Sequence, residues 1–198
     1  MNSVNTETLC GGVLAGGASR RMGSAKAFLQ LEERSFLART AAALAPVVDR
    51  VFILGTGDSP PDAKGWPRLA DAPGVQGPLA GMLAAFAEAP HAVWIFAACD
   101  LPLVSPPAVR WLLAQRWPGC WAVLPRLGED RVEPLLALYE PEARPRLEEL
   151  ARGPSFSLQP LAALPGIVTP TPPAALRSAW RNVNTPGELS VLMAELDR

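Results

Sequence analysis

Glycine and basic residues are concentrated directly after the first apolar segment of the chain. They include Gly16 and Gly17, the pair Arg20 and Arg21, and Lys26. Glycine lets backbone N–H groups approach an anion closely, and the cationic side chains supply charge for several phosphates. The spacing is neither that of the Walker loop nor that of the G-x-G-x-x-G dinucleotide fingerprint. The run therefore predicts a phosphate-binding loop of another kind.

Asp100 is the second residue whose position suggests chemistry. It follows segment 92–98, the most continuous apolar run of strand length in the chain. A carboxylate at the end of a buried strand suits Mg²⁺, which takes oxygen ligands and bridges phosphate oxygens. The alternative is a structural turn residue ahead of Pro102.

Two asparagines near the C-terminal end form a third candidate. Asn182 and Asn184 alternate on an extended stretch, so both amides can face one surface and offer donors and acceptors to a ligand. Capping and turn formation before Pro186 is the structural alternative.

The elements that must position these residues follow a regular pattern. Apolar runs of strand length alternate with stretches of helical spacing, which is typical of a parallel sheet with helices on both faces. The expected strands are 8–15, 51–54, 68–70, 92–98, 120–124, 132–139 and 180–183. The expected helices are 35–44, 78–89, 106–117, 142–151 and 186–196, and segment 154–173 is expected to be irregular. Ser35 and Thr185 are the expected N-caps of the first and last helices, the latter with Glu188 in a capping box.

The length of 198 residues suits one domain. We expect an α/β, doubly wound, mostly parallel sheet with a C-terminal substrate lobe. Residues from about 8 to 125 would form the nucleotide-binding part, and residues from about 126 to 198 the lobe.

Composition excludes several classes of function. The 18 basic and 19 acidic residues give a net charge of -1, which argues against binding nucleic acid through bulk charge. No stretch is long and apolar enough for a membrane span, and we expect a cytoplasmic protein. The three cysteines, Cys10, Cys99 and Cys120, are expected to be buried thiols. His91 is the single histidine, which excludes sites that need two; it and the six tryptophans are expected in packing roles.

The glycine-rich run carries a resemblance to a known family. Residues 14–26, LAGGASRRMGSAK, resemble the signature L-A-G-G-x-S-x-R-M-G-x-D-K of the molybdenum cofactor guanylyltransferases, the MobA-like branch of the nucleotidyltransferases. Segments 77–82 (GPLAGM), 99–102 (CDLP) and 182–186 (NVNTP) resemble three further family motifs in order and spacing. The resemblance extends from about residue 9 to 192, and it implies a Rossmann-like fold of the nucleotide-diphospho-sugar transferase type.

The resemblance also implies an activity and roles for residues. The family transfers GMP from GTP to molybdopterin, with Mg²⁺ or alternatively Mn²⁺, and releases pyrophosphate. Lys26 and Arg21 would hold the phosphates of GTP, and Asp100 would bind the metal. The other implied nucleotide-binding residues are Leu14, Ala15, Gly16, Gly17, Arg20, Asp71, Gly77, Pro78 and Gly81. The residues expected to face molybdopterin are Arg126, Glu133, Asn182 and Asn184, with Arg131 nearby.

Two positions depart from the family pattern and keep alternatives open. Ala25 stands where an aspartate usually precedes the lysine, and Leu54-Gly55 stands where some members carry a base-contacting asparagine. One alternative is a transferase that uses CTP or acts on a sugar phosphate, although Gly16-Gly17 favours guanine. The other is a non-catalytic carrier that hands cofactor to an enzyme. Implied protein partners are molybdoenzyme apoproteins and other proteins of cofactor biosynthesis.

Overall fold

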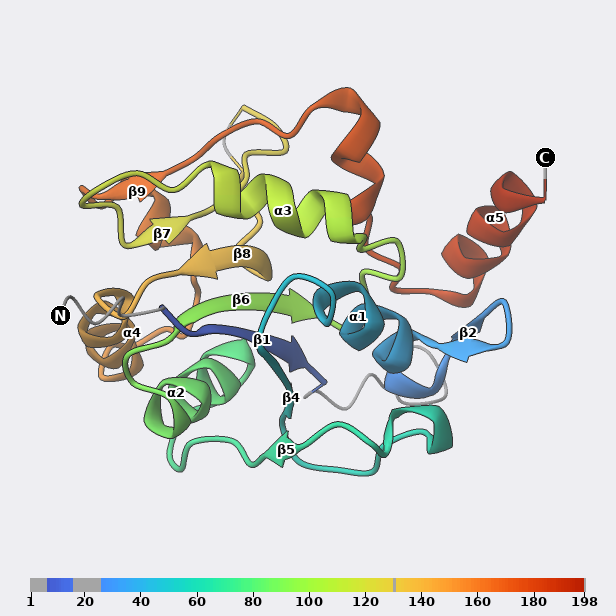
Figure 1. Ribbon diagram of the computed structural model, residues 1–198, viewed down its shortest axis with the longest axis horizontal. Helices are drawn as coiled ribbons and strands as arrows, with labels where there is room; N and C mark the ends of the chain where they lie inside the picture. Colours follow the sequence, from blue (N-terminus) through green and yellow to red (C-terminus); the bar gives the residue numbers. More distant parts are fainter. Residues whose placement is uncertain (1–6, 16–25, 130, 198) are drawn as a thin grey trace, which may run out of the picture.

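A seven-stranded sheet runs through the middle of the molecule (Figure 1). The computed structural model describes residues 7–15, 26–129 and 131–197. The strands, in spatial order, are β5 (Arg68–Leu69), β4 (Arg50–Leu54), β1 (Leu9–Leu14), β6 (Val93–Ala98), β8 (Leu136–Tyr139), β7 (Ala122–Val123) and β9 (Ile167–Val168). Neighbours from β5 to β6 are parallel, β8 is antiparallel to both β6 and β7, and β9 is parallel to β7.

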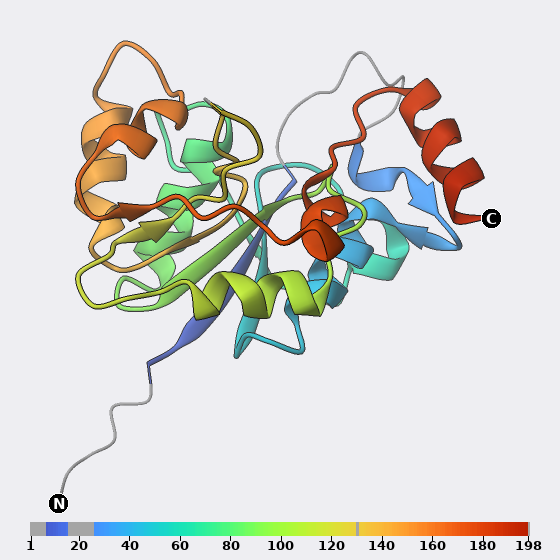
Figure 2. The same ribbon diagram turned by 90° about the horizontal axis from the view of Figure 1, so that it is seen from above.

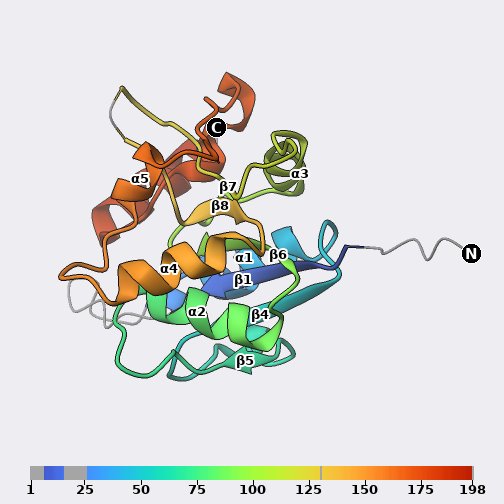
Figure 3. The ribbon, with the colours of Figure 1, turned by 90° about the vertical axis from the view of Figure 1, so that its left-hand side faces the viewer.

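Helices cover both faces of this sheet. One face carries α1 (Phe36–Leu44) and α3 (Pro106–Ala114), and the other carries α2 (Pro78–Glu88) and α4 (Ala143–Ala151). Figure 3 shows α2 and α4 together on their face of the sheet, where they contact each other. The expected doubly wound, mostly parallel architecture is confirmed. None of the helices in the described part of the chain is long and apolar enough to cross a membrane.

The central strand β6 explains why both faces need a cover. All of its residues are buried, and successive side chains alternate between the two cores. Val93 and Ile95 belong to the core under α1 and α3, whereas Trp94 and Phe96 belong to the core under α2 and α4. An uninterrupted apolar run is what a strand buried on both sides requires.

A smaller apolar cluster joins the C-terminal helix to an N-terminal hairpin. The hairpin consists of β2 (Gln30–Leu31) and β3 (Arg34–Ser35), and α5 (Pro186–Leu196) lies beside it, away from the main sheet (Figure 2). Leu192 of α5 packs with Leu31 and Phe36, and Val183 completes the buried group. The hairpin was not expected, because two-residue strands leave no periodic pattern.

Side-chain caps begin two of the helices as the sequence predicted. Ser35 Oγ accepts a hydrogen bond from the Ala38 N–H at 3.1 Å at the start of α1. Thr185 Oγ1 accepts one from the Glu188 N–H at 3.2 Å at the start of α5. Each hydroxyl satisfies a backbone donor that the first helical turn leaves unpaired.

The strand expected at 180–183 is wrong. Trp180 instead ends a 3-10 helix, Ala174–Trp180, and the following residues up to α5 lie in no strand. The indole of Trp180 donates to the Leu136 carbonyl, and the Val183 N–H donates to the Asp100 carbonyl. The apolar pattern of this segment reflects burial against loops, which period-two spacing alone does not distinguish from strand pairing.

Two other boundaries differ from expectation. Region 132–139 is a strand only from Leu136 onward, because Pro134 has no N–H to give to a ladder. Region 154–173 is not wholly irregular, since it contains β9 and the 3-10 helix Gln159–Ala163. The remaining 3-10 helices are Lys26–Phe28 and Pro61–Ala63.

Candidate functional site

The order of the strands identifies where a ligand should bind. From β1 the chain proceeds to β4 and β5 on one side and then returns to form β6 on the other side of β1. Doubly wound sheets bind ligands at such a reversal, outside the carboxyl ends of the strands. β1 ends at Leu14 and β6 at Ala98, and the Cys99 N–H donates to the Leu14 carbonyl at 3.1 Å. Asp100 therefore stands at this edge.

Lys26 and Asp100 form an ion pair at the same edge. Lys26 begins the 3-10 helix that leads to the β2–β3 hairpin, and its Nζ lies 2.7 Å from Asp100 Oδ2. The two side chains are 19% and 16% exposed, so the pair is partly shielded but open to a ligand. Two residues far apart in sequence and predicted to handle phosphate and metal thus meet.

The second oxygen of Asp100 has no hydrogen-bond partner among the described residues. Oδ1 is buried and accepts no hydrogen bond from the described residues. Such an oxygen is costly to leave unsatisfied, and a cation would satisfy it. No group of three or more His, Cys, Asp or Glu side chains able to hold a metal occurs in the described ranges. This sparse donor set suits Mg²⁺, which keeps several waters and is bound by one or two carboxylates together with substrate phosphates.

A segment from the C-terminal part of the chain lies against this pair. The Val183 N–H donates to the Asp100 backbone carbonyl at 2.9 Å, and the Asn184 side-chain Oδ1 lies 2.5 Å from Lys26 Nζ. Asn184 is exposed, whereas Val183 is fully buried in the small cluster beneath α5. Asn182, which was predicted to act with Asn184, makes no hydrogen bond through its amide to any described residue.

Asp71 and α2 form the other side of the edge. An ideal Cβ on Gly81 would lie 3.0 Å from Leu14 Cδ2, 3.1 Å from Leu54 Cβ and 3.5 Å from Asp71 Oδ1, so the helix approaches the strand ends closely there. Gly77 precedes the helix with φ of 70°, a conformation that favours glycine, and Pro78 is its first residue.

Of the other residues expected to contact the nucleotide, only some are described by the structure. The Ala15 N–H donates to the Leu54 carbonyl at 2.9 Å, which places Ala15 directly beside the end of β4. Gly16, Gly17, Arg20 and Arg21 lie outside the described residues.

Some of the residues expected to face the acceptor substrate already make hydrogen bonds within the protein. Arg126 donates to the Glu129 carbonyl at 2.9 Å and to Thr169 Oγ1 at 3.1 Å, so its guanidinium already holds the loop around it. Arg131 is exposed. Glu133 is 6% exposed, and its Oε1 accepts a hydrogen bond from the Leu135 N–H at 3.0 Å.

Burial raises the pKa of Glu133 above its usual value, and the charge of Asp100 adds to this effect. The Leu135 N–H and the charge of Arg131 oppose the rise without cancelling it. Cys99 is next to Asp100 in sequence, and burial raises the pKa of its thiol to about 12, so this sulfur stays protonated and unreactive. The three cysteines are buried and free, as predicted.

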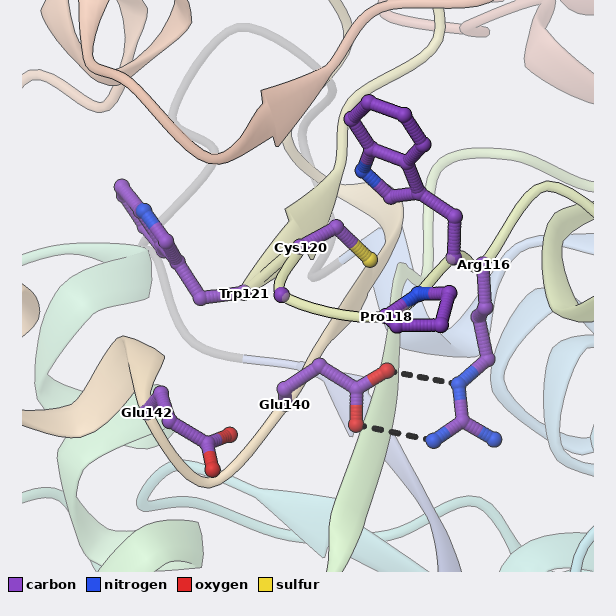
Figure 4. A pocket seen from close by; sticks show the side chains of 8 residues that line it. Arg116, Pro118, Cys120, Trp121, Glu140 and Glu142 are labelled. Atoms are coloured by element: carbon purple, nitrogen blue, oxygen red, sulfur yellow. Dashed lines mark hydrogen bonds and ion pairs between the residues drawn. The ribbon is translucent and has the colours of Figure 1, made fainter.

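A cavity of about 600 Å³ lies at the opposite end of the sheet (Figure 4). Its lining includes Arg116, which pairs with Glu140 at 2.6 Å and with Glu7 at 2.7 Å. The hydrogen bonds to Glu7 and Glu140 raise the pKa of Arg116. The bond between Arg116 and Glu7 also lowers the pKa of Glu7. Because both oxygens of Glu140 also accept from Arg116, this ion pair is satisfied without a ligand.

Two packing expectations are wrong. Trp117, at the rim of that cavity, is 65% exposed, and His91 is also exposed. The other tryptophans are buried or half-buried. Trp117 lies in the turn between α3 and β7, where no element covers it.

Sequence reasoning missed part of the site's framework. Arg68 donates to the Gly55 carbonyl at 2.8 Å and to Ser59 Oγ at 2.7 Å, which fixes the loop after β4. The Val183 to Asp100 bond is a backbone contact and leaves no sequence signal. Glu188 was noted as a capping residue, but its bond to the Asn184 N–H was not foreseen.

Comparisons with known proteins find relatives along almost the whole chain. Residues 11–162 match the family model described as a MobA-like NTP transferase domain. The chain is 32% identical over 195 residues to the protein of Pelotomaculum thermopropionicum named probable molybdenum cofactor guanylyltransferase, covering 95% of this chain and 94% of that one. A protein of the same name from Deinococcus radiodurans is 32% identical, with 93% of each chain covered.

A solved structure supports the fold separately. The crystal structure of molybdopterin-guanine dinucleotide biosynthesis protein A from Archaeoglobus fulgidus superposes with a TM-score of 0.75. It is 24% identical in sequence, and the match covers 95% of this chain and 98% of that one. At this level of identity the likeness speaks for the fold.

Proposed function

The chain belongs to the MobA-like NTP transferase family, and from this membership we propose that it transfers GMP from GTP to molybdopterin. A phosphate oxygen of molybdopterin attacks the α-phosphorus of GTP and forms a new P–O bond. The bond between the α-phosphorus and the bridging oxygen to the β-phosphorus breaks, and pyrophosphate leaves with its electron pair. The product is the guanine dinucleotide form of the cofactor.

One observation carries the proposal: Lys26, Asp100 and Asn184 meet at the switch point of the sheet, and Asp100 Oδ1 is buried with no partner in residues 7–15, 26–129 and 131–197. A transfer between phosphates needs positioning and neutralisation of charge more than covalent participation by side chains. The Lys26 ammonium suits the β- and γ-phosphates and the pyrophosphate that leaves. Arg21, with Arg20 beside it, is proposed to share this role on the strength of the family motif.

Asp100 is the residue that fits a divalent cation, Mg²⁺ or alternatively Mn²⁺. When bound, the cation supplies a positive charge that offsets the charge developing on the phosphates. Asp100 would hold it through Oδ1, the oxygen that Lys26 leaves free. No other carboxylate is assigned to the cation.

The two sides of the switch point suggest separate sites for the two substrates. Asp71, Gly77, Pro78 and Gly81 are proposed to border the nucleotide, together with Leu14, Ala15, Gly16 and Gly17. The close approach of Gly81 to Leu14 and Leu54 supports this, because a larger residue at position 81 would push α2 away from the strand ends beside Asp71.

The acceptor is proposed to bind on the side of β8, within the part that begins near residue 126. Glu133 and Asn182 remain its candidate contacts, with Asn184 at the boundary between the two substrates. Arg126 would contribute by holding the loop at Glu129 and Thr169 in place. We further propose that the protein works in the cytoplasm and delivers its product to molybdoenzyme apoproteins.

A competition experiment tests this function. Purified protein, Mg²⁺ and molybdopterin are incubated with GTP and CTP together, and the two dinucleotide products are separated. We expect the guanine product to dominate by roughly tenfold or more, a difference of about 1.4 kcal/mol in transition-state binding.

Two results would contradict the proposal, and each indicates a different alternative. A dominant cytosine product would mean a cytidylyltransferase, consistent with the departures at Ala25 and at Leu54-Gly55. Binding of GTP without any pyrophosphate release would mean a carrier. Lys64→Ala is the control for a substitution of Lys26 in this assay, because Lys64 is the only other lysine of the chain and is exposed.

A further inference from the structure

The first turn of α5 is capped in an unusual way. In a capping box the glutamate at the third helical position returns a hydrogen bond to the N–H of the N-cap residue. Here the N-cap is Thr185, yet Glu188 Oε2 accepts from the N–H of Asn184, at 2.5 Å, one residue earlier. The carboxylate therefore fixes the backbone of a residue that reaches the site.

Asn184 is held from both directions along the chain. Before it, Val183 is buried and its N–H donates to the Asp100 carbonyl at 2.9 Å. After it, Glu188 binds its N–H. With the backbone held on both sides, the amide oxygen of Asn184 lies 2.5 Å from Lys26 Nζ.

The two acceptors of the Lys26 ammonium differ in charge. Asp100 is an anion that a divalent cation would compete for, whereas the Asn184 amide is neutral and does not attract such a cation as strongly. A free lysine side chain loses conformational entropy when it is ordered. A fixed neutral acceptor orders Lys26 beforehand and reduces the loss that remains when phosphate binds.

We propose that Glu188 is a positioning residue, which acts through Asn184 to place the Lys26 ammonium for phosphate. The identity of the phosphate as part of GTP rests on the proposed function, but the coupling from Glu188 to Lys26 does not. Glu188 itself makes no hydrogen bond or ion pair with Lys26 or Asp100; it acts on them through its hydrogen bond to Asn184.

The lysine content of the chain allows a direct test. Lys26 and Lys64 are the only lysines, so protein labelled with ¹³C-lysine gives just two sets of side-chain NMR signals. Lys64→Arg assigns them, and the exposed Lys64 is an internal reference. We expect Glu188→Ala to shift the Lys26 Hε/Cε signal most of the way to its position in Asn184→Ala. Glu188→Gln, which keeps an oxygen acceptor, should restore it.

Two variants control for effects on the helix. Thr185→Ala removes the other half of the cap and leaves the bond between Glu188 and Asn184 in place. Glu195→Ala removes a carboxylate of the same helix that pairs with Arg181. Both should leave the Lys26 signal near its wild-type position, even where Thr185→Ala lowers the melting temperature as much as Glu188→Ala does.

Affinity for inorganic tripolyphosphate links the NMR signal to binding. Glu188→Ala should weaken it by roughly three- to tenfold and Glu188→Gln by less than twofold, in the range of one charge-assisted hydrogen bond. The double variant Glu188→Ala/Asn184→Ala should bind no more weakly than Asn184→Ala alone, because the two residues act in series.

An unmoved Lys26 signal in Glu188→Ala would overturn the proposal, as would additive losses in the double variant or wild-type protein that does not bind tripolyphosphate. Failure of guanylyl transfer is a distinct result. It would appear as absent dinucleotide product while the Lys26 signal and tripolyphosphate affinity still depend on Glu188.

Discussion

Charged side chains lie at both ends of the sheet, and the two groups differ in how completely they are paired. Where β1 and β6 begin, Arg116 is paired with Glu7 and Glu140, and both Glu140 oxygens accept hydrogen bonds. Where β1 and β6 finish, Asp100 pairs through one oxygen with Lys26, and its other oxygen is buried and accepts no hydrogen bond from the part of the chain that the structure describes.

The ion pairs of Arg116 stabilise the fold, whereas the Asp100 carboxylate can still bind a ligand. An ion pair whose hydrogen bonds are already made, as between Arg116 and Glu140, offers a ligand little to bind. An unsatisfied buried oxygen raises the free energy of the folded protein, and a ligand that binds there relieves it. The cavity at the Arg116 end is therefore a poorer guide to function than the chemistry of Asp100.

The largest expected effect concerns catalysis at the Asp100 end. Asp100→Asn keeps the shape of the side chain and removes its charge, so we expect the rate of pyrophosphate release to fall by roughly 100-fold or more. The free energy of unfolding should change little, because loss of the ion pair with Lys26 opposes the gain from removing a half-buried charge. Initial rates and urea denaturation on the same preparations measure both quantities. A large loss of stability would mean that Asp100 is structural.

The next effect concerns stability at the Arg116 end. Arg116→Ala leaves Glu140, which is 7% exposed, without its partner, and we expect a loss of about 2 kcal/mol in the free energy of unfolding. Pyrophosphate release per folded molecule should be unchanged. Arg110→Ala, at an exposed position of α3, is the matched control and should change stability by less than about 0.5 kcal/mol. Lost activity in folded Arg116→Ala protein would erase the distinction between the two ends.

The smallest expected effect depends on pH. Because burial raises the pKa of Glu133, its ionised form destabilises the folded state, and this cost grows as pH rises from the ordinary glutamate range through the raised value. Glu133→Gln has no charge and keeps an acceptor for the Leu135 N–H. Its melting temperature should match wild type in acid and exceed it at neutral pH. Equal melting temperatures at every pH would show that ionised Glu133 does not destabilise the folded protein.

Much of the fold could be predicted because buried strands and amphipathic helices leave long patterns. Strand β6 is apolar throughout since both its faces are covered, and the N-caps Ser35 and Thr185 are local signals. The false strand at 180–183 shows the limit of this reasoning, since residues buried against loops can carry the same pattern.

The candidate site could be predicted in its parts but not in its connections. Lys26, Asp100 and Asn184 were each identified from motifs, because phosphate and metal chemistry need those residue types. The hydrogen bonds that join Val183 to Asp100 and Glu188 to Asn184 depend on how distant segments pack. Such contacts have no signature in a single sequence.

A crystal structure of the protein with GTP and Mn²⁺ tests the assigned site most directly, because the anomalous signal of manganese marks the cation. We expect a manganese peak on the Asp100 carboxylate, with the phosphates beside Lys26. Manganese and nucleotide bound elsewhere, for example at the cavity lined by Arg116 and Glu140, would contradict this assignment.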